Sequence, residues 1–146
     1  ALNNDWTGRL LVSANDSLMS ILDTWEAMGA TIDPMLPHFP VPVNSQFVFD
    51  SCTHEHDIRA AIGQAGARDS QSVRVALGFI RNMLSQRAQP EAQELLQATI
   101  NDFDFFRSLG GRRSAAQIAE CGLDPSKVQV VMETLPLSIP TTSVPE

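Results

Sequence analysis

The densest group of side chains capable of chemistry lies between Cys52 and Asp57, where a thiol, two histidines and two acids fall within six residues. Two ligands of one metal ion project from the same side of a helix only when they are three or four residues apart. His54 and His56 are two residues apart and diverge by about 200° on a helix, so they cannot share an ion there. An extended segment would place Cys52, His54 and His56 on one side, but the flanking capping residues favour a helix. We interpret the segment as the charged first turn of a helix and assign it no catalytic or metal-binding role.

The spacing motifs of common enzyme classes are absent from the sequence. No glycine-rich phosphate loop follows a strand pattern, neither GxSxG nor HExxH occurs, and no serine, histidine and aspartate set can be singled out. Cys52 and Cys121 lie far apart and have neither CxxC nor zinc-ligand spacing, which leaves open whether they are bridged. We expect no enzymatic activity, cofactor or metal in this chain alone.

Charge and hydropathy narrow the classes of partner. The 146 residues include 17 acids and 10 bases, for a net charge of −7, and 43% of them are apolar. A surface with this charge repels a phosphate backbone, so we do not expect nucleic acid as a partner. No apolar stretch approaches the roughly 20 residues that span a bilayer. We expect no membrane association and a cytoplasmic (intracellular) location.

Apolar residues recur every three to four positions along most of the chain, which is the spacing of amphipathic helices. Capping residues and glycines set the expected boundaries. The sequence therefore predicts an all-α fold, a single-domain bundle of five to six helices over residues 1–135, followed by a proline-rich extended tail over residues 136–146. The expected helices cover about residues 18–28, 51–66, 70–84, 90–109, 114–121 and 125–135.

Prolines interrupt the helical pattern between Asp33 and Val43, where four of them fall within nine residues. Because proline lacks an amide donor and restricts the residue before it to extended geometry, we expect a loop or crossover here. The next apolar stretch, Gln46 to Phe49, fits either a short strand or an apolar plug over the core, and four residues do not decide between them.

The last third of the chain, residues 112–135, has the pattern of a helix-turn-helix unit. Ser114 is an expected N-cap, Gly122 lies in the expected turn, and Asp124 followed by Pro125 is a strong start signal for the second helix. A second helix that reads DNA would direct arginine, lysine, asparagine or glutamine side chains at base edges.

That second helix is too apolar on too many sides to read DNA. Its first exposed candidates, Lys127 and Gln129, are followed by a run of three apolar residues. Arg112 and Arg113 add two charges, which contribute little against a net charge of −7. Excess apolar surface fits packing against another protein better, so we expect a homo-oligomer or a partner protein. A DNA-binding transcriptional regulator is the alternative.

The same reasoning selects candidate contact residues. The predicted interaction residues are Phe105, Lys127, Val130, Val131 and Met132. Phe105 is included because it points away from the side of the helix that Phe103 and Phe106 share. The candidate lining of a ligand pocket is Trp25, Phe103 and Phe106. If Val131 lies in an interface, Val131→Asp shifts a dimer to a monomer without unfolding it, whereas unfolding would place Val131 in the core.

The stretch from Glu94 to Leu135 combines a phenylalanine-rich helix, a glycine turn and the sequence SAAQIAECGLDPSKVQVVMETL. It resembles the winged-helix portion of the N-terminal dimerisation domain of small-molecule O-methyltransferases that use S-adenosylmethionine. The residues that match core positions of that family are Phe103, Phe106, Ile118, Ala119, Leu123, Val128 and Leu135. In that family these helices pair subunits and help to roof the substrate pocket. The adenosylmethionine-binding sheet and a wing hairpin are missing from the pattern, so the resemblance implies a non-catalytic dimerisation module.

A second resemblance concerns the order of segments along the chain. The HFP turn, the helices that follow and the FFRSLGG segment are similar to rod-shaped plant virus coat proteins, whose acidic bundles stack around RNA. This resemblance implies a self-assembling helical coat-like subunit as a further alternative.

Overall fold

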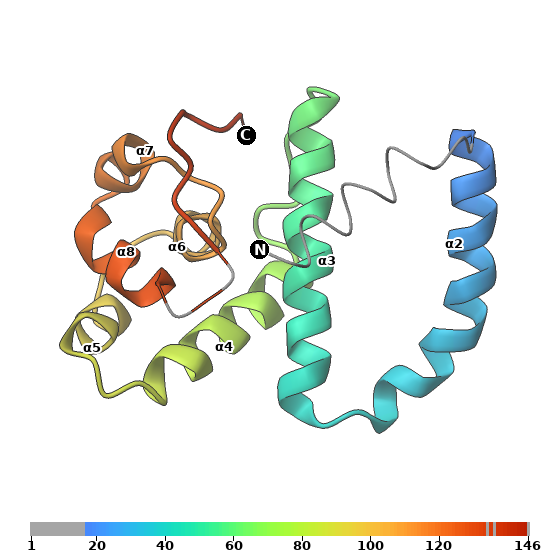
Figure 1. The fold of residues 1–146 in the computed structure, drawn as a ribbon, viewed down its shortest axis with the longest axis horizontal. Helices are drawn as coiled ribbons and strands as arrows, with labels where there is room; N and C mark the ends of the chain where they lie inside the picture. Colours follow the sequence, from blue (N-terminus) through green and yellow to red (C-terminus); the bar gives the residue numbers. More distant parts are fainter. Residues whose placement is uncertain (1–16, 134, 136, 146) are drawn as a thin grey trace. The chain divides into compact units, whose positions relative to one another are not determined.

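The computed structural model describes residues 17–133, 135 and 137–145, and the regular elements among them are all helices (Figure 1). The all-α prediction is confirmed, although these residues form seven α-helices and one 3-10 helix instead of five to six helices. In chain order the elements are α2 (Leu18–Ile32), the 3-10 helix η1 (Asp33–His38), α3 (Val41–Ala61), α4 (Gln71–Ser85), α5 (Pro90–Leu96), α6 (Asp102–Leu109), α7 (Ala115–Glu120) and α8 (Pro125–Met132).

The chain divides into two compact units, residues 1–40 and residues 41–146. Among the described residues the first unit holds α2 and η1. The second holds α3 to α8 and the C-terminal segment, residues 137–145, which has no regular secondary structure. The division between the two units falls directly before α3. The sequence predicted one domain over residues 1–135, with no boundary there.

A local cap starts α2. The Ser17 hydroxyl accepts a hydrogen bond from the backbone N–H of Ser20 at 3.2 Å, which satisfies one of the amides left free at a helix start. The helix continues through Gly29, where the sequence predicted its end, to Ile32. A single glycine inside a helix costs about 1 kcal/mol relative to alanine, which is too little to end it here.

The proline-rich stretch is mostly helical, so the prediction of a loop over Asp33 to Val43 is wrong. Pro34 lies in the first turn of η1 and Pro42 in the first turn of α3. The N–H groups at these positions have no helical partner in any residue type, so proline is tolerated there. Gln46 to Phe49 is neither a strand nor a plug, because it lies inside the 21-residue helix α3.

Helix α4 contributes the most regular apolar face of the second unit. The Ser70 hydroxyl caps it by accepting from the backbone N–H of Val73 at 3.3 Å. The buried residues of α4 recur at helical spacing: Val73, Ala76, Leu77, Ile80 and Leu84. Helix α4 packs against α3, α5 and α6. The predicted helix over residues 70–84 is thus present and amphipathic.

The single helix predicted over residues 90–109 is two helices, α5 and α6. The side chain of Asn101 accepts hydrogen bonds from the backbone N–H groups of Phe103, at 2.9 Å, and Asp104, at 3.3 Å, and so starts a new helix. Helix α6 is the centre of the second unit, because six of its eight residues are buried. Phe106 is fully buried, with its ring edge-on to Phe49 of α3 at a centroid distance of 6.0 Å.

The helix-turn-helix-like pair, α7 and α8, follows the sequence pattern closely. Ser114 and Gln117 form a reciprocal capping box at the start of α7. Gly122 adopts a φ of 91° in the connection, a conformation that glycine supplies without strain. The Asp124 side chain caps α8 by accepting from the backbone N–H of Ser126 at 2.9 Å. Helix α8 ends at Met132, three residues before the predicted end.

The C-terminal segment, residues 137–145, has no regular secondary structure and packs on the helices of the second unit. Leu137 and Ile139 pack against the core. Gln117 of α7 donates to the carbonyl of Val144 at 2.8 Å and accepts from its N–H at 2.9 Å. A Cβ atom at Gly111 would lie 3.1 Å from the carbonyl oxygen of Ser138, so a glycine lets the segment pass close to the α6–α7 connection.

Candidate protein-association surface

The main exposed apolar feature of the first unit is one side of α2. We define the α2 stripe as the six apolar residues Leu18, Ile21, Leu22, Trp25, Met28 and Ile32, which recur every three or four positions. Each of them is between 41% and 71% exposed, and no residue of α2 is buried. The sequence predicts the first five of these residues as one side of a helix, which is confirmed, and the helix adds Ile32.

The acids of α2 lie away from the stripe. Asp23 and Glu26 are the charged residues of this helix, and both project from its other sides. A contiguous apolar side framed by polar residues is the usual composition of a protein contact surface. The stripe is therefore the strongest candidate contact surface on the first unit.

Two of the residues predicted as contacts on α8 lie in the core of the second unit. Val131 and Met132 are fully buried, and Phe105 of α6 is 3% exposed. Helix α8 packs against α5 and α6, and these contacts supply the apolar cover that the sequence pattern left unassigned. Val131→Asp would place a carboxylate in the core of the second unit, so the substitution does not probe an interface.

The other two predicted contact residues of α8 lie nearer the surface. Val130 is half-buried, and Lys127 forms an ion pair with Glu94 of α5. This pair connects α8 to α5 at the surface and engages the one lysine of the chain.

The predicted pocket residues fall in different units. Trp25 is 69% exposed on α2, in the first unit. Phe103 and Phe106 are buried in the second unit, where their ring centroids lie 6.1 Å apart. Both rings belong to the buried hydrophobic cluster of the second unit. Trp25 belongs to the α2 stripe.

A hollow of about 750 Å³ does open beside the helix-turn-helix-like pair. The residues that line it are Ser114, Ala115, Ala116, Pro125, Ser126, Gln129, Ile139, Pro140, Thr141, Thr142 and Ser143. Its wall is formed by the starts of α7 and α8 together with the C-terminal segment. Small and hydroxyl side chains dominate it, and it contains no charged group that would select a ligand.

The arginines that would contact phosphate in a DNA-binding unit are engaged with carboxylates. Arg113 donates to Asp104 at 2.7 Å and is buried, and Arg112 donates to Asp57 at 2.9 Å. Charge that is neutralised within the protein contributes little to the counterion release that drives binding to nucleic acid. Arg112 and Arg113, just before α7, therefore do not supply the free positive charge with which a DNA-binding helix pair contacts phosphates.

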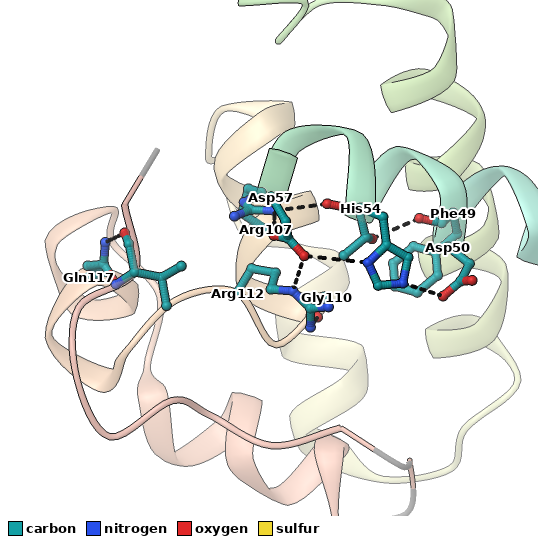
Figure 2. Close-up of polar contacts among 10 residues, drawn as sticks. Phe49, Asp50, His54, Asp57, Arg107, Gly110, Arg112 and Gln117 are labelled. Carbon is teal, nitrogen blue, oxygen red and sulfur yellow. Dashed lines mark hydrogen bonds and ion pairs between the residues drawn. The ribbon is translucent and has the colours of Figure 1, made fainter. Parts of the chain in front are cut away.

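Asp57 is the centre of a polar cluster that joins α3 to α6 and to the connection after it (Figure 2). One carboxylate oxygen accepts from Arg107 at 3.0 Å and the other from Arg112 at 2.9 Å. His54 lies 3.7 Å from both Asp57 and Asp50. Burial raises the pKa of Asp57, but the hydrogen bonds from the two arginines outweigh this effect and hold the pKa below its ordinary value of 3.8. The cluster is a structural ion-pair network that ties together segments distant in sequence.

The Cys52–Asp57 segment lies in the second half of α3, so its assignment to a first turn is wrong. Burial raises the pKa of the Cys52 thiol to about 11, which keeps it protonated and a poor nucleophile at neutral pH. His56 is buried with its ring edge-on to Phe103 at 4.7 Å, and burial lowers its pKa below 6.5. No set of three or more metal-ligating side chains gathers among the described residues.

Comparison of the chain with known protein families, curated proteins and solved structures finds no match. No helix in the described part of the chain is both long and apolar enough to cross a membrane. Proposals about function therefore rest on the physical chemistry of this chain alone.

The sequence predicted five residues of the α2 stripe as one side of a helix and missed Ile32, because it placed the helix end at Gly29. A helical stripe has the same spacing whether a core or a partner covers it. The available signal was the continuation of the spacing past Gly29 to Ile32, four residues after Met28. Such regularity is typical of helices that pair lengthwise with another helix.

Proposed function

We propose that this chain is a protein-association module and that the α2 stripe is its contact surface. One observation carries the proposal: a 15-residue helix with an apolar side has no buried residue. Burying apolar side chains against a partner is the main driving force of such contacts, at roughly 25 cal/mol per Å² of apolar surface.

The length of α2 supports the same proposal. Isolated helices of about 12 to 15 residues are only marginally stable in water, even in favourable sequences. Helix α2 has 15 residues, among them Gly29 and several β-branched residues, which are weaker helix formers. It therefore needs contacts beyond its own backbone to stay helical, and a partner surface would supply them.

The resemblance to the dimerisation domain of O-methyltransferases also implies a protein-association module, but it concerns residues 94–135 and not α2. In that resemblance the contact lies around the helix-turn-helix-like pair. Because Phe105, Val131 and Met132 are buried there, the proposal places the contact on α2 instead. Dimerisation as such stays a prediction of the sequence.

Hydrogen exchange of the α2 amides tests the proposal. We expect peptides that cover Leu18–Ile32 to be protected in the associated protein and to lose this protection in Trp25→Glu, which puts a charge into the stripe. The matched control is Ala30→Glu, which adds the same charge to an exposed position on the opposite side of α2. Protection of α2 in a protein that light scattering shows to be monomeric would contradict the proposal, because the chain would then cover the stripe itself.

A further inference from the structure

The C-terminal segment of the second unit is anchored near its two ends. At one end Leu137 and Ile139, two residues apart, pack against the core. At the other end Val144 pairs with the side chain of Gln117 in α7. Among the described residues, these two hydrogen bonds are the ones that link residues 137–145 to the helices, so the stretch between the anchors crosses the helices without one.

Gln117 recognises the backbone of the segment and not a side chain. Its Nε2 donates to the carbonyl oxygen of Val144 at 2.8 Å, and its Oε1 accepts from the N–H of Val144 at 2.9 Å. A neighbouring β-strand offers the same two hydrogen bonds to a residue of an extended chain. The capping box orients the carboxamide, because Oε1 also accepts from the N–H of Ser114 at 3.1 Å. This contact therefore accepts any residue except proline, which has no N–H.

The apolar anchor lies where the helices leave room for a peptide backbone. Gly111, in the connection between α6 and α7, has a φ of 70°, and a Cβ atom there would lie 3.1 Å from the carbonyl oxygen of Ser138. The glycine lets this backbone come close while the side chains on either side of Ser138, Leu137 and Ile139, pack against the core. This end of the contact thus selects apolar side chains at alternate positions.

Between the two anchors the segment borders the hollow of about 750 Å³ beside the helix-turn-helix-like pair. Residues 139–143 form one wall of this hollow, and the starts of α7 and α8 form the other. Protein interiors are close-packed, so a segment that served only as part of the core would leave no space of this size. The contact is specific at both ends and loose in the middle. Peptide-binding surfaces likewise combine hydrogen bonds to the peptide backbone with pockets for a few side chains.

We call residues 137–145 the strap, and the surface formed by Gly111, Gln117 and the starts of α7 and α8 the strap groove. We propose that the strap groove binds a non-helical peptide segment of a partner protein and that the strap occupies it as an internal competitor. The partner segment carries two apolar side chains at alternate positions and, five positions after the second, a residue other than proline, whose backbone pairs with Gln117. This contact surface lies in the second unit and is independent of α2.

The strap controls access to the groove through its high local concentration. A segment joined to its binding site by a short connection has an effective concentration on the order of 1 mM. A partner segment of the same intrinsic affinity must exceed this concentration to displace the strap. Releasing the strap should therefore raise the affinity for a separate peptide by roughly tenfold or more.

Binding of a synthetic peptide to the full chain tests the proposal. The probe is a fluorescein-labelled peptide with the sequence of residues 137–145, LSIPTTSVP, and its fluorescence anisotropy reports binding. The double substitution Leu137→Ser with Ile139→Ser removes the apolar anchor of the strap and leaves the strap groove unchanged. We expect this chain to bind the peptide roughly tenfold more tightly than the unaltered chain. Equal affinity of the two chains, or no binding to either, would overturn the proposal.

A second release variant covers the case in which the double substitution unfolds the second unit. Val144→Pro removes the N–H that donates to Gln117 and leaves both apolar residues in place. This chain should keep the helical circular dichroism of the unaltered chain and also bind the peptide more tightly. If both release variants lose their helical signal, the strap is an obligatory part of the core and the proposal is wrong.

Matched substitutions on the groove separate specific docking from unspecific apolar contact. In the released chain Gln117→Ala should weaken peptide binding several-fold, because both hydrogen bonds to the backbone are lost. Gln129→Ala is the control, because Gln129 lines the same hollow without a hydrogen bond to the strap, and it should leave the affinity unchanged. A scrambled peptide of the same composition should not bind. Equal binding of the scrambled peptide would overturn the proposed groove.

Light scattering identifies the source of the segment. We expect release of the strap to leave the mass of the chain in solution unchanged. If the unaltered chain instead forms dimers that are lost in the Leu137→Ser, Ile139→Ser variant, the strap of a second copy occupies the groove. That result would overturn the assignment to a different protein.

Discussion

Asp57 shows how one residue can hold distant parts of the second unit together. Its carboxylate binds Arg107, which is 1% exposed, and Arg112, and both arginines follow it by 50 residues or more. A buried guanidinium is tolerated because it is paired and hydrogen-bonded. Removing the Asp57 carboxylate should therefore lower the free energy of unfolding, because the charge of Arg107 would stay buried without this partner.

Replacing Asp57 should destabilise the protein. Removing one member of a fully buried ion pair costs about 3–5 kcal/mol, and Asp57 is 30% exposed, so we expect a loss of about 2 kcal/mol in Asp57→Asn. The matched control is Asp50→Asn on the same helix, whose side chain is 72% exposed and which should change stability by less than about 0.5 kcal/mol. Urea unfolding followed by circular dichroism measures both. Equal effects of the two substitutions would show that the Asp57 cluster contributes nothing specific.

Two groups of α3, His56 and Asp57, predict two steps in the dependence of stability on pH. The folded-state pKa of His56 is lowered from 6.5 by burial, and that of Asp57 is lowered from 3.8 by its arginines. A lowered folded-state pKa means that the unfolded chain binds the proton more tightly, so stability falls as the pH drops below the unfolded value. We expect one loss below about pH 6.5 and a further loss below about pH 4. His56→Phe should remove the first step and Asp57→Asn the second, as measured by urea unfolding across this pH range.

At the scale of elements, short polar contacts decide where helices begin. Asn101 breaks the predicted helix over residues 90–109 into α5 and α6 because its side chain accepts from two backbone amides. Phe105 points away from the side of α6 that Phe103 and Phe106 share, yet it is buried because α6 is covered on most of its sides. The capping potential of Asn101 is readable in the sequence, but the uninterrupted apolar spacing around it favoured a single helix.

Gln117 should control the docking of the C-terminal segment on α7. In Gln117→Ala both hydrogen bonds to Val144 are lost, so the amides of residues 137–145 should exchange faster with solvent. Part of the effect would come from the capping box, which is worth about 1 kcal/mol. Ser114→Ala controls for this, because it weakens the cap while Gln117 keeps its pairing with Val144. Equal exchange of the segment in both variants would contradict a specific role of Gln117.

At the scale of the whole molecule, the division at Pro40 predicts that the second unit folds alone. The buried hydrophobic cluster belongs entirely to residues after Val41, and α2 contributes no buried residue. We therefore expect a chain of residues 41–146 to melt cooperatively, within about 5 °C of the full chain, which corresponds to about 1 kcal/mol for a domain of this size. It should also stay monomeric by light scattering. A non-cooperative melt would show that the first unit is needed for the core.

Local chemistry made much of this protein predictable from its sequence. Helical periodicity and capping residues act over four or five positions, so the all-α class, the starts of α4, α7 and α8 and the amphipathic side of α2 follow from the sequence alone. The loop predicted from the prolines between Asp33 and Val43 was wrong because proline, which breaks the interior of a helix, is tolerated in its first turn.

Only the tertiary structure decided which apolar surfaces are covered. The apolar residues of α8 and α2 look alike in sequence, yet Val131 and Met132 are buried by α5 and α6 whereas Trp25 stays exposed. The hydrophobic effect is non-directional: the spacing of side chains shows that one side of a helix needs cover but not what provides it. The partners of Asp57, 50 and 55 residues away, are likewise set by packing and not by any local pattern.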